Sequence, residues 1–313
     1  MSALAFTALA LLLAGPVPAV LARATWPLRA PRAAVVLWQA IALAAVLSAF
    51  SAGLAVAAQL FVPGTGGHPG TSPAMGIDAG IATLGWPLWL AAALVLTATV
   101  MIGFRLMAAV MQVAIGTRRR RARHRAMVDL LGECRQNMDD VRVLRVAEPL
   151  AYCLPGIRRR VVLSAGAIQT LSESELAAIL RHERAHLGAR HDLVLEAFIA
   201  VHTAFPRFVR SGSALGAVAL LVELLADDAA VRATGRGPLA RALVACASAK
   251  TPVGALAAGG PSTVLRVRRL AARPNSRAIA AAAYLAAAAI LTVPTVAVAV
   301  PWLTELHRLF LAR

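Results

Sequence analysis

The chain has 313 residues, of which 59% are hydrophobic, and its formal net charge is +17. A mean hydropathy of +0.70 excludes an ordinary water-soluble domain. The positive charge would suggest a nucleic-acid-binding protein, but no Lys or Arg occurs between Ala33 and Phe104, and this uneven distribution is typical of a membrane protein.

Four apolar runs are long enough to cross a bilayer, which takes about 20 residues. These runs, which contain no charged residue, are Ser2 to Ala22, Ala33 to Val62, Leu84 to Phe104 and Ala278 to Leu303. No basic segment precedes the first run and two others follow closely. We therefore expect a retained transmembrane helix there and not a cleaved signal peptide.

The basic residues predict the orientation of these runs. Arg23, Arg29 and Arg32 lie between the first two runs, and most of the others lie between Arg118 and Arg277. The loop Pro63 to Thr83 has none. Because positively charged loops stay in the cytoplasm, we expect the loops with arginine on the cytoplasmic side of a bacterial inner or plasma membrane. Both termini are then expected on the outer side.

The basic block Arg118 to Arg125 follows the third run directly. We expect it to stop translocation and to contact anionic lipid headgroups. No aromatic residues alternate with these arginines, so we expect no direct binding of nucleic acid. The two other interpretations of the block are a phosphate-binding arm and a solvated turn.

The segment between the third and fourth runs has the pattern of a small α+β domain. Arg123 to Gln136 is predicted to form an amphipathic helix, and Val141 to Val146 alternates as a strand does. Two more short strands, Leu150 to Leu154 and Arg160 to Ser164, are separated by a Pro-Gly turn. Together they predict a three-stranded sheet. The chain has three cysteines, an odd number, and we expect all of them to be free thiols: Cys134, Cys153 and Cys246.

The pentad H-E-R-A-H at residues 182–186 is the strongest chemical signal in the chain. It lies in Leu176 to Leu195, a stretch with helical apolar spacing that Ser172 to Glu175 opens with a capping-box pattern. Residues four apart share a helix face, so His182 and His186 can bind one metal ion and Glu183 can reach a water on it. This arrangement is typical of zinc peptidases. The alternative is a pair of surface histidines.

Zinc in a hydrolytic site takes three protein ligands and keeps one position open, so one ligand remains to be found. On a continuous helix Glu196 would lie about 15 Å beyond His186, and His191 would rotate away. A second helix-prone segment carries Glu223 and Asp227 four residues apart. We expect Glu223 to bind the metal and Asp227 to accept the N–H of a ligating imidazole. The alternative is the solvated tip of a helix.

H-E-x-x-H followed by E-x-x-A-D resembles the gluzincin-type membrane metallopeptidases. Two branches fit, the HtpX-like quality-control proteases and the BlaR/MecR-type antirepressor proteases. The run Cys153 to Ile168, the segment Leu171 to Leu176 and the core H-E-R-A-H-L resemble the BlaR/MecR branch more closely. The likeness covers Arg142 to Leu270 and the layout of the apolar runs. The penicillin-sensing domain of the antibiotic sensors is missing after the last run.

The resemblance implies one Zn²⁺ per chain, bound by His182, His186 and Glu223. It implies Glu183 as general base and Asp227 as a partner of a ligand. In relatives of this fold an edge strand at the position of Val161 to Ser164 pairs with extended substrate. His191 stands where many relatives carry Asp. Four residues are candidates to stabilise the oxyanion: Arg266, Arg269, His202 and Tyr152.

The sequence thus predicts a mainly α membrane protein with four transmembrane helices and a cytoplasmic, zincin-like α+β metallopeptidase domain between the third and fourth. The expected regions are 1–116, 117–276 and 277–313. The predicted activity is zinc-dependent hydrolysis of a cytoplasmic or membrane protein, with a transcriptional repressor as one candidate substrate. The alternatives are a membrane-protein quality-control protease and a non-catalytic, zinc-binding signalling scaffold. The lipid bilayer is the other expected partner.

Overall fold

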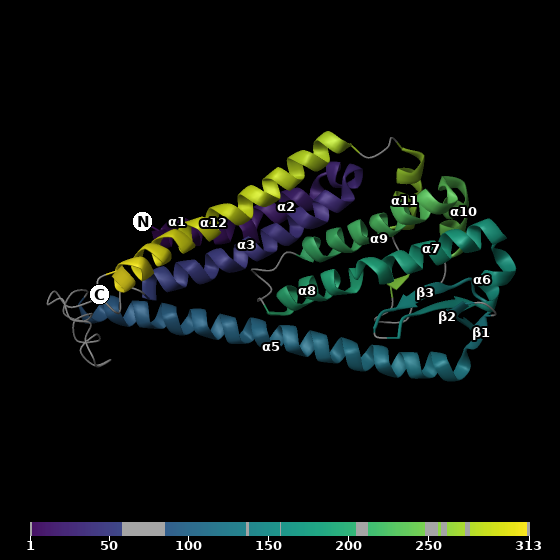
Figure 1. Cartoon of the computed structure of the whole chain (residues 1–313), viewed down its shortest axis with the longest axis horizontal. Helices are drawn as coiled ribbons and strands as arrows, with labels where there is room; N and C mark the ends of the chain where they lie inside the picture. Colours follow the sequence, from purple (N-terminus) through teal and green to yellow (C-terminus); the bar gives the residue numbers. More distant parts are fainter. Residues whose placement is uncertain are drawn as a thin grey trace.

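The computed structural model describes residues 2–57, 85–135, 138–156, 158–204, 212–247, 256–257, 262–272 and 276–311. The described chain is mainly helical, with one small sheet at the end of the molecule opposite the C-terminus (Figure 1). The expected loop Pro63 to Thr83 and the end of the second apolar run lie outside the described residues.

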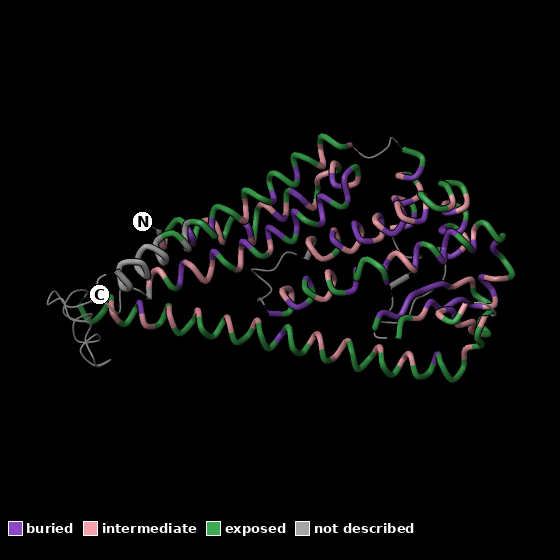
Figure 2. Tube along the Cα trace, viewed as in Figure 1, coloured by how far each residue is buried: buried purple, intermediate pink, exposed green. Residues whose placement is uncertain are grey.

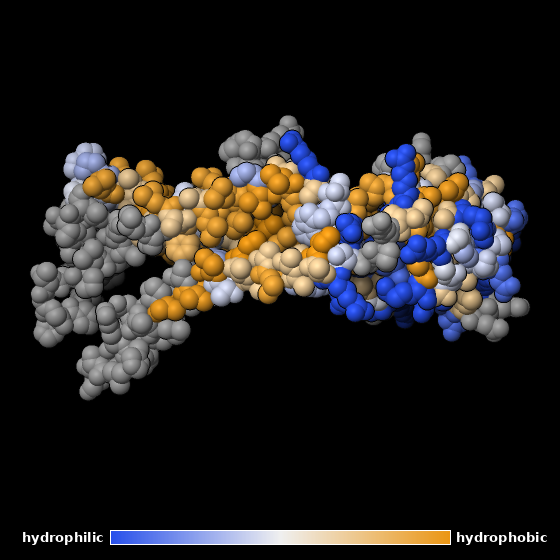
Figure 3. Space-filling view, turned by 90° about the horizontal axis from the view of Figure 1, so that it is seen from above, coloured by the Kyte–Doolittle hydropathy of each residue, from blue (hydrophilic) through white to orange (hydrophobic). Residues whose placement is uncertain are grey.

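Four helical stretches of the described chain are long and apolar enough to cross a membrane. They are Ala3–Arg23, Pro31–Val56, Trp86–Leu131 and Arg277–Val296. The first is divided at Gly15 into α1 (Ser2–Ala14) and α2 (Pro16–Arg23), and the others belong to α3 (Pro31–Ala57), α5 (Trp86–Leu131) and α12 (Arg277–Leu311). Figure 3 shows the apolar surface gathered on this part of the molecule and the hydrophilic surface on the other.

The long helix α5 corrects one expectation. It runs without interruption for 46 residues, about 69 Å, and the separate amphipathic helix expected from Arg123 to Gln136 is its continuation. No Gly or Pro lies between Thr117 and Leu131, and the arginines there favour a helix, so nothing ends α5 before Gly132. Figure 2 shows α5 exposed over most of its length.

Two apolar helices fill the space between α3 and α5. They are α8 (His191–Ala204) and α9 (Gly212–Thr234) (Figure 1). Phe198 of α8 and Val218 of α9 belong to one buried cluster with Trp38 of α3, and Arg105 of α5 donates a 2.7 Å hydrogen bond to the C-terminal carbonyl of Ala204. Each helix therefore packs one side on the apolar helices, while Leu193 and Ile199 of α8 are exposed.

The sheet has five strands in the described residues, in the order β1-β2-β4-β3-β5. Their bounds are β1 Glu133–Arg135, β2 Met138–Leu144, β3 Ala151–Leu154, β4 Arg160–Ser164 and β5 Leu256–Ala257. One face of the sheet packs with Ile179 and Leu180 of α7 (Glu173–Ala189), and the other packs with Val128 of α5. The sheet thus joins the ligand-bearing helix α7 to the end of α5.

The expectation that Val161 to Ser164 forms an edge strand is wrong. β4 lies between β2, its parallel neighbour, and β3, its antiparallel neighbour, so both of its edges are hydrogen-bonded. The turn before β3 fixes this order, because Ser164 Oγ donates to Glu148 O and accepts from Leu150 N. Gly166 completes the turn, since an added Cβ there would lie 1.8 Å from the carbonyl oxygen of Ala147.

The last elements of the half that contains the sheet are three short helices. They are α6 (Ala165–Thr170), α10 (Arg236–Ala245) and α11 (Thr263–Ala271). Leu239 and Leu243 of α10 are fully buried in the same cluster as the sheet residues Val161 and Leu163. α11 brings Arg266, which is 1% exposed, into the interior beside α9.

Candidate metal centre

The helix α7 positions the first part of the site. Ser172 accepts a hydrogen bond from Glu175 N and the Glu175 side chain accepts one from Ser172 N, so the expected capping box is confirmed. The helix ends at Ala189, where Arg190 takes a left-handed conformation with φ 54°. The helix therefore ends six residues before Leu195, where the helical stretch was expected to end, and this changes the position of His191.

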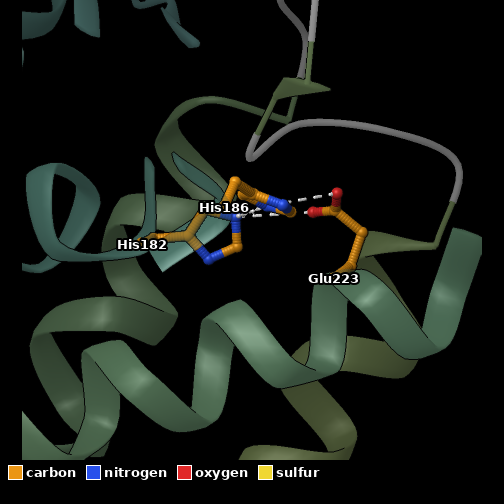
Figure 4. Close-up of side chains that lie close together, drawn as sticks. All are labelled: His182, His186 and Glu223. Carbon is orange, nitrogen blue, oxygen red and sulfur yellow. Dashed lines mark hydrogen bonds and ion pairs between the residues drawn. The ribbon is translucent and has the colours of Figure 1, made fainter. Parts of the chain in front are cut away.

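Three donor side chains meet between α7 and α9 (Figure 4). The Nε2 atoms of His182 and His186 are 3.2 Å apart. The carboxylate of Glu223 lies 3.4 Å from the first of these nitrogens and 3.5 Å from the second. Both imidazoles are buried, at 0% and 1% exposed.

These distances fit a metal ion. A tetrahedral zinc site with bonds of about 2.1 Å separates its ligand atoms by about 3.4 Å. The three distances observed are close to that value, with Oε2 of Glu223 facing His182 and Oε1 facing His186, and the donor set of two imidazoles and one carboxylate suits zinc. Within the described residues, this is the group of His, Cys, Asp and Glu side chains placed closely enough to hold a metal ion.

The protonation of the donors also suits a cation. Burial lowers the pKa of His186 to about 3, which keeps its imidazole neutral. Burial opposes ionisation of Glu223, but its contacts with His182 and His186 hold its pKa below the usual value. Burial would likewise lower the pKa of His182, but the carboxylates of Asp227 and Glu223 raise it to about 9. A bound cation would replace that proton.

Glu183 is fully buried on α7 next to the first histidine. Neither oxygen of its carboxylate has a hydrogen-bond partner among the described residues. Burial, together with the nearby Glu183 carboxylate, raises the pKa of the free thiol of Cys153 on β3. Burial also raises the pKa of Glu183 itself to about 7. A carboxyl group with this pKa can both accept and release a proton at neutral pH.

Asp227 lies one turn after Glu223 on α9 and supports His182. Its Oδ1 is 3.0 Å from His182 Nδ1, on the ring edge away from the proposed metal, as expected. Arg266 of α11 donates to both oxygens of Asp227, at 2.6 and 2.8 Å, and its third nitrogen lies 3.0 Å from Glu223. Although burial opposes its ionisation, these partners hold the pKa of Asp227 well below its usual value.

Arg266 thus contacts two carboxylates of the site from the interior. One sequence signal for it is that Arg266 shares the buried face of the amphipathic helix α11 with Thr263 and Leu270. Arg269, the second arginine considered for the oxyanion, pairs with Asp228 and with the carbonyl of Leu28. Tyr152 is hydrogen-bonded to His124, and His202 lines an apolar cavity between α1, α3, α8 and α9.

His191 is the residue that the sequence analysis missed. Because α7 ends at Ala189, the chain turns and brings His191 Nδ1 to 3.0 Å from His186 Nδ1. A metal ion on Nε2 of His186 would leave the proton on its Nδ1, which would then donate to His191. The expectation that His191 rotates away is wrong, because it assumed one continuous helix.

The comparison with known families agrees with this arrangement. A family model, BlaR1 peptidase M56, matches residues 7–205, which include α7 and the two histidines but end before Glu223. No curated protein and no solved structure matches the chain. The match spans well over half of the 313 residues and extends from the first apolar helix to the end of α8. The chain belongs to the BlaR1 peptidase M56 family, a family of membrane metallopeptidases.

Proposed function

We propose that this protein is an integral-membrane zinc endopeptidase. The observation that carries the proposal is the convergence of His182, His186 and Glu223 at distances that match the edges of a tetrahedral zinc site. When bound, zinc would polarise the scissile carbonyl and lower the pKa of a water molecule to near 7. One Zn²⁺ would be held per chain.

The protein groups have distinct roles in this proposal. Glu183, buried and without a hydrogen-bond partner, takes a proton from the attacking water and delivers it to the leaving amine. Asp227 accepts the Nδ1 proton of His182 and so fixes the tautomer that presents Nε2. Arg266 balances the charges of Asp227 and Glu223 in a region with little solvent.

The substrate would bind in an extended form beside α7. β3 packs against this helix, and its outer edge is hydrogen-bonded to the short strand β5, which ends the sheet on that side. Addition of a strand at a sheet edge is a common way to bind an extended peptide. A substrate segment would therefore have to pair with β5 or replace it. The substrate class we propose is a cytoplasmic or membrane protein, with a transcriptional repressor as the leading candidate.

The proposed orientation places the metal centre on the cytoplasmic side of a bacterial cell membrane. The arginine-rich segments between the apolar helices support this orientation through the positive-inside rule. Under this proposal residues 117–276 are the cytoplasmic protease region, and 1–116 and 277–313 are the membrane regions.

The test is Glu183→Gln in the full-length protein. This variant should fold and keep its zinc, because Glu183 is not a ligand, but proteolysis should fall by about 100-fold or more. Zinc content is measured by mass spectrometry and cleavage by identification of proteins that accumulate uncut in cells. Glu173→Gln, an exposed position in the first turn of α7, is the matched control and should behave like wild type.

Wild-type cleavage by a zinc-loaded Glu183→Gln protein would contradict the hydrolytic role of this residue. An unchanged cellular phenotype with no cleavage in either protein would instead favour the zinc-binding scaffold.

A further inference from the structure

A second polar cleft lies between α7 and α9, outside the metal centre. It has a volume of about 340 Å³ and is lined by three arginines and three alanines: Arg181, Arg184, Ala185, Ala229, Arg232 and Ala233. None of the metal-binding candidates lines it. At 100° per residue, Arg181 lies about 100° around α7 from His182, and Arg232 lies about 180° around α9 from Glu223.

Small side chains create the space in this cleft. Alanines at 185, 229 and 233 leave room where the two helices pack, and the long arginine side chains surround that room. A phosphate group with its water molecules fits a space of this size. The cleft is open to solvent, with Arg181 and Arg232 exposed and Arg184 half-buried along its walls.

The charges in this cleft are not balanced within the protein. Arg184 is bound by Asp140 through two hydrogen bonds of 2.9 Å. Arg181 and Arg232 have no carboxylate within ion-pair distance among the described residues. Three guanidinium groups and one carboxylate leave an excess of two positive charges around the cleft.

We propose that this cleft binds a doubly charged oxyanion of the phosphate type. Guanidinium groups present paired N–H donors that match the oxygens of phosphate, and a phosphate group carries between one and two negative charges at neutral pH. Such an ion balances the charge that Asp140 leaves uncompensated. A single carboxylate would balance only half of it.

The position of the cleft gives the ligand an effect on the metal centre. Arg181 directly precedes His182, and Ala185 directly precedes His186. An oxyanion held by Arg181 of α7 and Arg232 of α9 would link the two helices that carry the proposed zinc ligands. Because a ligand that binds only the folded state stabilises it, binding should raise the stability of this helix pair.

The test is binding of inorganic phosphate and pyrophosphate to the full-length protein in detergent micelles, measured by calorimetry at low salt. The double variant Arg181→Gln/Arg232→Gln should lower the affinity by about tenfold or more. Lysine at both positions should restore part of it, since the charge returns without the paired donors. Arg268→Gln, an exposed arginine of α11, is the matched control and should bind within about twofold of wild type.

The same experiment contains the results that would overturn the proposal. Equal phosphate affinity in wild type and in the double glutamine variant would place any binding elsewhere on this basic protein. Binding of a hexaglutamate peptide through Arg181 and Arg232, with no binding of phosphate, would show a docking site for an acidic protein segment instead. Both variants keep the zinc ligands, so zinc content should not change.

Discussion

His186 is held from two sides in this structure. Its Nε2 faces His182 and Glu223, and its Nδ1 faces His191, which comes from the next helix. Partners of this kind usually fix the tautomer of a metal-binding imidazole, and they are commonly carboxylates or carbonyls. Here the partner is an imidazole, and we propose that His191 accepts the Nδ1 proton of His186 and positions it without binding the metal.

Replacement of His191 by Ala should lower the affinity for zinc by about 10 to 100-fold, because His186 loses the partner that orients it. Zinc affinity is measured by competition with a chelator. His191→Gln retains an acceptor and should recover part of the loss, which a purely steric role would not predict. Thr203→Ala, at an exposed position of the same helix α8, should leave the affinity unchanged. Unchanged zinc affinity in His191→Ala would show that His186 needs no such partner.

The third proposed ligand can be tested on its own. Within the described residues, Glu223 is the carboxylate grouped with both imidazole donors, so Glu223→Ala should reduce zinc to well below one per chain. His186→Ala should do the same. Glu173→Ala changes an exposed carboxylate of α7 outside the donor cluster, and it should keep its zinc. Full zinc occupancy in Glu223→Ala would mean that another carboxylate completes the site.

The contact between α5 and α8 is built around a buried ion cluster. Arg121 of α5 lies 3.0 Å from Asp192 and 2.6 Å from Glu196, and all three side chains are at most 13% exposed. Arg121 belongs to the basic block expected to contact lipid headgroups, but it points into the protein. Asp192 directly follows His191, so the cluster connects the long helix α5 to the partner of His186.

Arg121→Met should destabilise the protein, because two buried carboxylates lose their cation. Breaking a buried pair typically costs about 3–5 kcal/mol. The midpoint of thermal unfolding should fall by about 5 °C or more. Arg119→Met, at an exposed position of the same block, should have little effect. Adding Asp192→Asn and Glu196→Gln to Arg121→Met should restore much of the lost thermal stability, because no unpaired charge then remains. If stability is not restored, the loss comes from packing and not from the unpaired carboxylates.

The surface of the molecule is divided into an apolar part and a charged part (Figure 3). α8 and the first turns of α9 extend into the apolar part, where they pack on Trp38 and Ile41 within the stretch Pro31–Val56. Glu223 lies five residues, about one and a half turns, further along α9 than Val218, toward the charged part.

The orientation of the molecule can be tested with reporter fusions. A reporter fused after Gly235, between α9 and α10, should be active only as a cytoplasmic reporter. One fused after Gly70, which lies outside the described residues, should be active only as an external reporter. The reverse result would place the metal centre on the outer side and would remove a cytoplasmic repressor from the candidate substrates.

Local sequence alone predicted much of this protein. The four apolar helices follow from composition, because about 20 apolar residues in a row have few other stable arrangements. The capping box and the shared face of His182 and His186 follow from helical periodicity, which needs no distant contact. The structure also places Glu223 beside these two histidines, where the sequence analysis expected a third donor, and its role as a ligand stays a prediction.

Tertiary structure decided the rest, since those features depend on contacts between residues far apart in the chain. The end of α7 at Arg190 placed His191 against His186, and only the folded chain brought Arg266, 39 residues after Asp227, into the interior. β4 became an internal strand because the turn before β3 is bonded to Ser164. Composition and periodicity specify which segments are helical and which are apolar, but the free energy that orders them against one another comes from packing and buried charge pairs, which no local pattern contains.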